Sequence, residues 1–154
     1  MSAKKYLVKL TVNGVPETYE VTADELLVDT LRNRCGNTSV KRGCDNGECG
    51  ACTVLMNGKA VPSCEVLTVE ADGTDLLTLE GLSGEELDPI QQAFLNHGAI
   101  QCGFCTPGMV LTTKALLNEN PHPSEEEIVE ALQNNICRCT GYVNILKAVH
   151  SLID

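Results

Sequence analysis

The sequence predicts an α+β chain of two small domains, a strand-rich first half and an all-helical second half. In the first half, apolar and polar residues alternate on both sides of Asn13-Gly14, a dipeptide that favours a tight hairpin turn. In the second half this alternation is replaced by helix-start signals, the first of which is Asp88-Pro89. We place the boundary in the glycine-bearing stretch 80–84, which gives domains 1–81 and 82–154.

The elements of the first half follow from the alternation and from turn dipeptides. Thr22 to Glu25 has the spacing of a capping box, and the apolar residues after it predict a helix that stops at Cys35-Gly36. Asn57-Gly58 predicts a second hairpin. The expected strands cover residues 6–12, 15–21, 53–56, 59–64 and 76–79.

Four helices are expected in the second half, each with a recognisable start. The start signals are Asp88-Pro89, Thr106-Pro107, the capping box at Ser124 and a cap at Thr140. Gly98 is expected to end the first of these helices, and the stretch 118–123 is expected to end the second.

The charge and composition exclude several classes of function. The chain has 11 Lys+Arg against 21 Asp+Glu, a formal net charge of −10, and only 3% aromatic residues, so we expect no nucleic-acid partner. No apolar run reaches the roughly 18 residues that a membrane span requires, and residues 6–12 are too short for a signal peptide. We therefore expect a cytoplasmic protein without a membrane span.

Nine cysteines in 154 residues are an unusual number, and they predict metal binding. An odd count without a signal peptide is atypical of a secreted disulfide framework. Setting Cys35 aside leaves eight thiols in two sets of four, the number that two four-thiolate sites require. The first set is Cys44, Cys49, Cys52 and Cys64, and the second is Cys102, Cys105, Cys137 and Cys139.

The first set has the C-x4-C-x2-C spacing of plant-type [2Fe–2S] sites, with Cys64 as a later fourth ligand. A loop that wraps a small anionic cluster has to approach it closely with its backbone N–H groups. Gly43, Gly47 and Gly50 are expected to permit this approach through positive φ angles. A structural zinc knuckle is the alternative, although it leaves the glycines unexplained.

The second set consists of two closely spaced pairs, each directly before an expected helix start at Thr106 or Thr140. Two helix N-termini would then point their free N–H groups at one anionic cluster. Two closely spaced cysteine pairs can also bind a tetrahedral zinc ion, so zinc remains an alternative on spacing alone.

Four stretches together resemble one known family. They are 44–52, 61–64, 101–109 and 137–142, and residues 78–82 and 88–94 extend the match along the chain. The sequence resembles the small iron–sulfur subunit of the molybdenum hydroxylases, the family of xanthine dehydrogenase, aldehyde oxidoreductase and carbon monoxide dehydrogenase.

The resemblance implies a β-grasp ferredoxin-like domain followed by a four-helix domain, each holding one [2Fe–2S] cluster through the four cysteines of its set. It also implies two partners, a large subunit that binds molybdopterin and a medium subunit that binds FAD, in a higher-order hetero-oligomer. Gln101 and Cys139 match the positions that touch the pterin in that family.

The implied function is electron transfer from molybdenum through the helical-domain cluster and then the ferredoxin-domain cluster to FAD. The chain would thus be the iron–sulfur subunit of an oxidoreductase, with no substrate-converting site of its own. Two alternatives stay open on the sequence, a free-standing two-cluster carrier of the ferredoxin type and a zinc-binding protein without a redox role.

Overall fold

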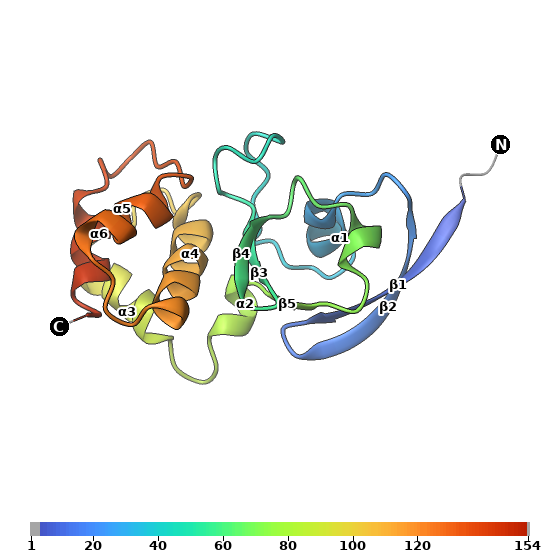
Figure 1. The fold of residues 1–154 in the computed structure, drawn as a ribbon, viewed down its shortest axis with the longest axis horizontal. Helices are drawn as coiled ribbons and strands as arrows, with labels where there is room; N and C mark the ends of the chain where they lie inside the picture. Colours follow the sequence, from blue (N-terminus) through green and yellow to red (C-terminus); the bar gives the residue numbers. More distant parts are fainter. Residues whose placement is uncertain (1–3, 154) are drawn as a thin grey trace.

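The computed structural model describes residues 4–153, which form two domains side by side along the longest axis of the molecule (Figure 1). Each domain has its own hydrophobic core. One core is built on Val8, Leu10 and Val28, and the other on Phe94 and Ile145. Within the described range, no helix is both long enough and apolar enough to cross a bilayer.

The first domain is a five-stranded mixed sheet. Its strands are β1 (Lys5–Val12), β2 (Val15–Thr22), β3 (Thr53–Met56), β4 (Lys59–Pro62) and β5 (Asp75–Leu77), in the order β2-β1-β5-β3-β4. The two sequence-adjacent pairs are antiparallel hairpins closed by Asn13-Gly14 and Asn57-Gly58, as expected. β1 and β5 are parallel, so the first strand of the chain is an internal strand, between β2 and β5. This arrangement, with the helix that follows β2 packed on the sheet, confirms the ferredoxin-like prediction.

That helix is α1 (Leu27–Asn33), and its start differs from the expectation. The expected capping box at Thr22 is absent, because Thr22 ends β2 and the N-cap residue is Leu26, which makes no side-chain cap. Glu25 instead accepts hydrogen bonds from Arg34 and Thr30. The helix is held by burial of its apolar face rather than by a cap, since Leu27 and its neighbours on that face are fully buried.

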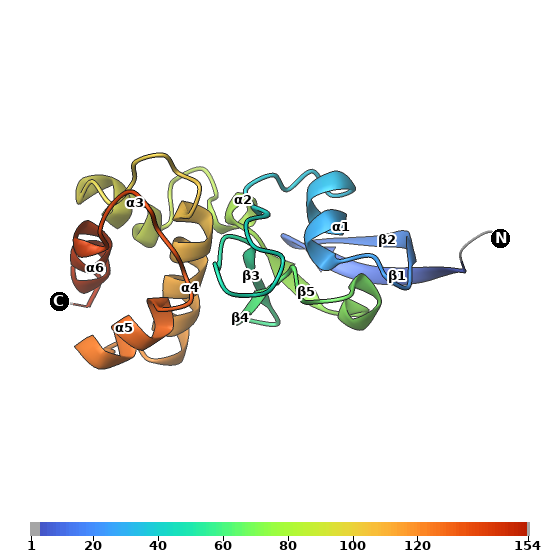
Figure 2. The ribbon, with the colours of Figure 1, turned by 90° about the horizontal axis from the view of Figure 1, so that it is seen from above.

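The second domain contains the four expected helices, with α4 against both α3 and α5 and α3 against α6 (Figure 2). They are α3 (Pro89–Asn96), α4 (Thr106–Glu119), α5 (Glu125–Leu132) and α6 (Val143–His150). The side chains of Asp88 and Ser124 cap α3 and α5 and close capping boxes with Gln91 and Glu127. The helical half of the fold prediction is therefore confirmed.

Two short elements were not predicted, the 3-10 turn η1 (Thr68–Ala71) and α2 (Leu79–Leu82). α2 occupies the stretch in which the sequence predicts the end of a strand and a linker. The strand ends early because the backbone N–H of Thr78 donates to the Asn13 side chain and its hydroxyl donates to Glu80. The division at residue 81 stays a prediction, and α4 packs directly on β3 and β4 across it.

Candidate metal centres

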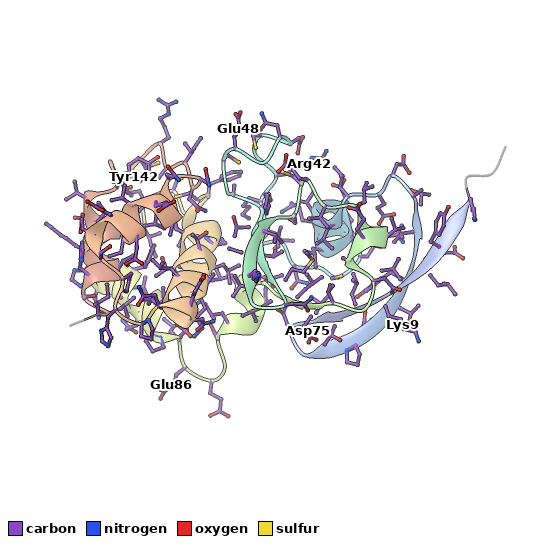
Figure 3. The ribbon with its side chains drawn as sticks, viewed as in Figure 1. Lys9, Arg42, Glu48, Asp75, Glu86 and Tyr142 are labelled. Carbon is purple, nitrogen blue, oxygen red and sulfur yellow. The ribbon has the colours of Figure 1, made fainter. Side chains whose placement is uncertain are left out.

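The first cysteine set lies around the irregular loop that leads into β3, drawn in teal at the top of Figure 1. Cys52 and Cys64 are buried beneath this loop, whereas Cys44 and Cys49 are partly exposed. The structure thus brings all four thiols to one end of the sheet, where the loop closes over them. Glu48 projects from the outer end of this loop (Figure 3).

Backbone N–H groups of the loop point at the sulfurs. The N–H of Cys49 donates to Cys44 Sγ at 3.4 Å. Burial alone would raise the pKa of Cys44, but the N–H groups of Asn46, Cys49 and Glu48 lower it to about 7. Burial raises the pKa of Cys64 to about 11, although the N–H of Gly47 acts in the opposite direction. The loop N–H groups therefore stabilise negative charge on Cys44, whereas burial disfavours it on Cys64.

The three loop glycines are required for two different reasons. Gly47 and Gly50 have φ angles of +73° and +67°, as expected. Gly43 is not in this region of φ, so that part of the expectation was wrong. Glycine is required at position 43 for a steric reason, because a Cβ there would lie 2.8 Å from Cys49 Sγ. Asp45 also has a positive φ, 61°, which nothing in the sequence indicated.

The second cysteine set lies at one end of the helical domain. Cys102 and Cys139 are exposed, and their sulfurs are 3.5 Å apart. Cys137 is buried and Cys105 is partly buried. The fold therefore brings the pair Cys102 and Cys105 next to the pair Cys137 and Cys139, and one edge of this site faces solvent.

Polar contacts also set the charge preference of this second site. Burial raises the pKa of Cys105 to about 12, and the neighbouring Cys137 adds to this shift. Burial would raise the pKa of Cys137 as well, but the Thr140 hydroxyl, which donates to its sulfur at 3.1 Å, lowers it together with nearby N–H groups. The N–H of Phe104 lowers the pKa of Cys102.

The expectation that both pairs precede a helix start holds for only one of them. Cys105 is the N-cap residue of α4. The last helix starts at Val143 rather than after Thr140, because Gly141 and Tyr142 both adopt positive φ angles. Tyr142 instead supports the loop, since its hydroxyl accepts the N–H of Cys137 at 2.9 Å. Neither charge nor spacing identified this tyrosine.

The donor set fits two [2Fe–2S] clusters better than zinc. Within each set, the thiols are arranged as two pairs of neighbours. The pairs are Cys44 with Cys49, Cys52 with Cys64, Cys102 with Cys139 and Cys105 with Cys137. Tetrahedral zinc needs four ligands at once, whereas each iron of a [2Fe–2S] cluster takes two thiolates and shares two sulfides.

The two sites meet across the domain boundary. The backbone N–H of Ile136 donates to the carbonyl of Cys49 at 2.9 Å, and Asn135 Nδ2 donates to the carbonyl of Gly50 at 3.2 Å. The Phe104 ring lies beside Gly43, 3.7 Å from the position of an added Cβ. These contacts depend on how the domains pack, so no motif in the sequence indicated them.

Gln101, expected to face a pterin together with Cys139, is exposed and adjoins Cys102. Because the sulfurs of Cys102 and Cys139 are in contact, Gln101 belongs to the exposed edge of the second site. A group on another subunit could therefore reach this edge.

Comparisons with known proteins agree with this arrangement. Residues 10–79 match a family model described as a 2Fe-2S iron-sulfur cluster binding domain, and residues 78–150 match one described as a [2Fe-2S] binding domain. The chain is 48% identical over 152 residues to the nicotinate dehydrogenase small FeS subunit of Eubacterium barkeri, which covers 97% of this chain and 96% of that protein.

Solved structures give the same result. The chain matches quinoline 2-oxidoreductase from Pseudomonas putida 86 with a TM-score of 0.91 and 44% identity, over 96% of this chain and 91% of that chain. It matches aldehyde oxidoreductase from Desulfovibrio gigas with a TM-score of 0.91 and 41% identity, over 96% of this chain but only 17% of that longer chain. With its two [2Fe–2S]-binding domains, the chain belongs to the small iron–sulfur subunits of the molybdenum hydroxylase family of oxidoreductases.

Proposed function

We propose that this chain relays electrons from a molybdenum centre on a large subunit, through two [2Fe–2S] clusters, to FAD on a medium subunit. The observation that carries the proposal is the direct contact between the two cysteine loops, made by the hydrogen bond from Ile136 to Cys49. Two electron carriers held at such a junction are suited to pass electrons to each other.

The residues that would hold the clusters are the eight cysteines of the two sets. Each contacting pair would bind one iron, so Cys44, Cys49, Cys52 and Cys64 would hold one cluster and Cys102, Cys105, Cys137 and Cys139 the other. When bound, each cluster supplies a site that accepts and releases one electron. The loop N–H groups and the Thr140 hydroxyl would favour the more negative, reduced state by donating to the cysteine sulfurs.

The exposed edge of the second site supports an approach of molybdopterin there. Cys139 and Gln101 are both exposed, so a pterin held by the large subunit could contact them without any change in this chain. The match to a single longer aldehyde oxidoreductase chain, of which this chain covers 17%, is consistent with a larger catalytic part outside it.

The FAD-binding partner is assigned to the first site on the family resemblance and on position. The exposed Glu48 projects from the outer end of the first cysteine loop, on the same side of the molecule as Tyr142 and opposite Glu86 (Figure 3). Because both loops reach the surface, a hetero-oligomer can contact each site separately. A reducing cytoplasm would keep the eight thiols available for iron.

Purification of the tagged chain from its native host tests the proposal. We expect molybdenum and flavin to co-purify with it, and the flavin to be reduced when an aldehyde or an N-heterocycle such as nicotinate or quinoline acts as substrate. A chain that purifies alone, with iron but without molybdenum or flavin, would support a free-standing carrier instead. Zinc without sulfide would exclude a redox role.

A further inference from the structure

Asn135 is a buried amide at the junction between the two cysteine sites. Its side chain is 4% exposed, with Nδ2 donating to the carbonyl of Gly50 at 3.2 Å and Oδ1 accepting from the Thr112 hydroxyl at 2.9 Å. A buried amide is costly unless it is hydrogen-bonded. The Asn135 side chain therefore specifies one packing of α4 and the helical-domain loop against the first cysteine loop.

Both ends of this contact lie next to cysteines. Gly50 directly follows Cys49, and Asn135 lies two residues before Cys137. The main chain repeats the link, since the N–H of Ile136 donates to the Cys49 carbonyl. The Asn135 side chain therefore adds a second link between the two sites, beside the main-chain link of Ile136.

The backbones of the two domains approach each other closely at Gly50 and Gly108. A Cβ on Gly50 would lie 2.4 Å from the Asn134 carbonyl, and a Cβ on Gly108 would lie 2.1 Å from the Gly50 carbonyl. The backbones are therefore at their closest approach, and the hydrogen bonds of Asn135 hold them there.

We propose that Asn135 is a positioning residue that sets the separation of the two sites and thereby the rate of electron passage between them. The inference rests on the proposed relay function. In each transfer one electron leaves the helical-domain site, which is oxidised, and enters the ferredoxin-domain site, which is reduced, and no bond is made or broken. Because electron tunnelling falls steeply with distance, a small increase in separation slows it strongly.

The test uses the assembled holoenzyme with Asn135→Leu, a neutral change of similar size that removes both hydrogen bonds. Asn134→Leu is the matched control, because Asn134 is the adjacent asparagine, is exposed, and has no side-chain hydrogen bond among residues 4–153. The first readout is the magnetic interaction between the two reduced clusters in the EPR spectrum, which depends on their separation. The second is the rate of electron equilibration between the clusters after rapid partial reduction.

We expect Asn135→Leu to weaken the magnetic interaction and to slow equilibration between the clusters, with iron content retained and the control unchanged. An unchanged interaction and rate in Asn135→Leu would overturn the inference. If Asn135→Leu loses a cluster, the inference is tested with Thr112→Val, because this variant removes only the hydroxyl that donates to Asn135. A smaller loss in the same direction supports the inference, and wild-type behaviour overturns it. A wild-type protein without two clusters would instead overturn the proposed function.

Discussion

The backbone N–H of Ile136 and the carbonyl of Cys49 are joined by a 2.9 Å hydrogen bond across the domain boundary. The carbonyl belongs to Cys49 of the first set, and Ile136 directly precedes Cys137 of the second set. The two cysteine loops therefore support each other, and a change at the junction should be felt at both sites.

Gly108→Ala should destabilise the packing of the two domains. The added Cβ would lie 2.1 Å from the Gly50 carbonyl oxygen, and this clash can be relieved only by moving the backbone. We expect a loss of about 1–3 kcal/mol in the free energy of unfolding, as for other overpacked sites, measured by urea denaturation. Gly84→Ala is the control, because a Cβ at Gly84 meets nothing within 4 Å. Equal stability of the two variants would contradict the observed closeness.

Cys49→Ser should remove one cluster and block electron delivery to flavin. Cys49 is one of the four thiols of the first set, and its pair partner is Cys44. We expect iron per chain to fall by about half and substrate-dependent flavin reduction to be lost, while the molybdenum centre is still reduced. The control is Cys35→Ser, which changes the one cysteine outside both sets. Full substrate-to-flavin transfer in Cys49→Ser would refute the proposed order of carriers.

Tyr142→Phe should weaken the loop that carries the second site. The phenol oxygen accepts the N–H of Cys137, and its removal leaves that group without this acceptor. We expect a loss of about 1 kcal/mol in stability and an altered EPR signal from the helical-domain cluster alone. Tyr6→Phe is matched in exposure, 37% in both cases, and the Tyr6 hydroxyl has no hydrogen bond among residues 4–153. A signal identical to wild type in Tyr142→Phe would show that the tyrosine has no effect on the site.

Glu25→Gln should destabilise the chain in a pH-dependent manner. Arg34 donates to both carboxylate oxygens of Glu25, at 2.6 and 2.7 Å, and this pairing lowers the pKa of the carboxyl. The ionised form therefore stabilises the fold above the ordinary pKa, and this contribution is lost as the pH falls through the lowered pKa. We expect a difference of about 1 kcal/mol from wild type at neutral pH, narrowing in acid. A difference that is constant across urea titrations at several pH values would exclude the ion pair as its cause.

The fold could be predicted where local signals agree with tertiary packing. Asn13-Gly14 sits in a hairpin turn and Ser124 forms a capping box, because both depend on neighbouring residues only. The prediction failed at Thr22 and Thr140. Glu25 accepts hydrogen bonds from Arg34 and does not form a cap. The positive φ angles after Thr140 move the start of the last helix to a later residue.

The site could be predicted only as far as spacing determines it. The two cysteine sets are brought together as the sequence indicated, whereas the ligand role of each cysteine stays a prediction. Asn135, Tyr142 and the steric role of Gly43 were missed, because each acts through a contact with a residue distant in sequence or with a folded loop. Periodicity and motif spacing carry no information about such contacts.

The most direct test of the relay is an analysis of iron, zinc, molybdenum and acid-labile sulfide in the natively purified protein, with EPR spectra after dithionite reduction. The account requires about four irons and four sulfides per chain, two distinguishable [2Fe–2S] signals that interact magnetically, and co-purifying molybdenum. About two zinc ions per chain, without sulfide or an EPR signal, would contradict it and leave the cysteines as a structural scaffold.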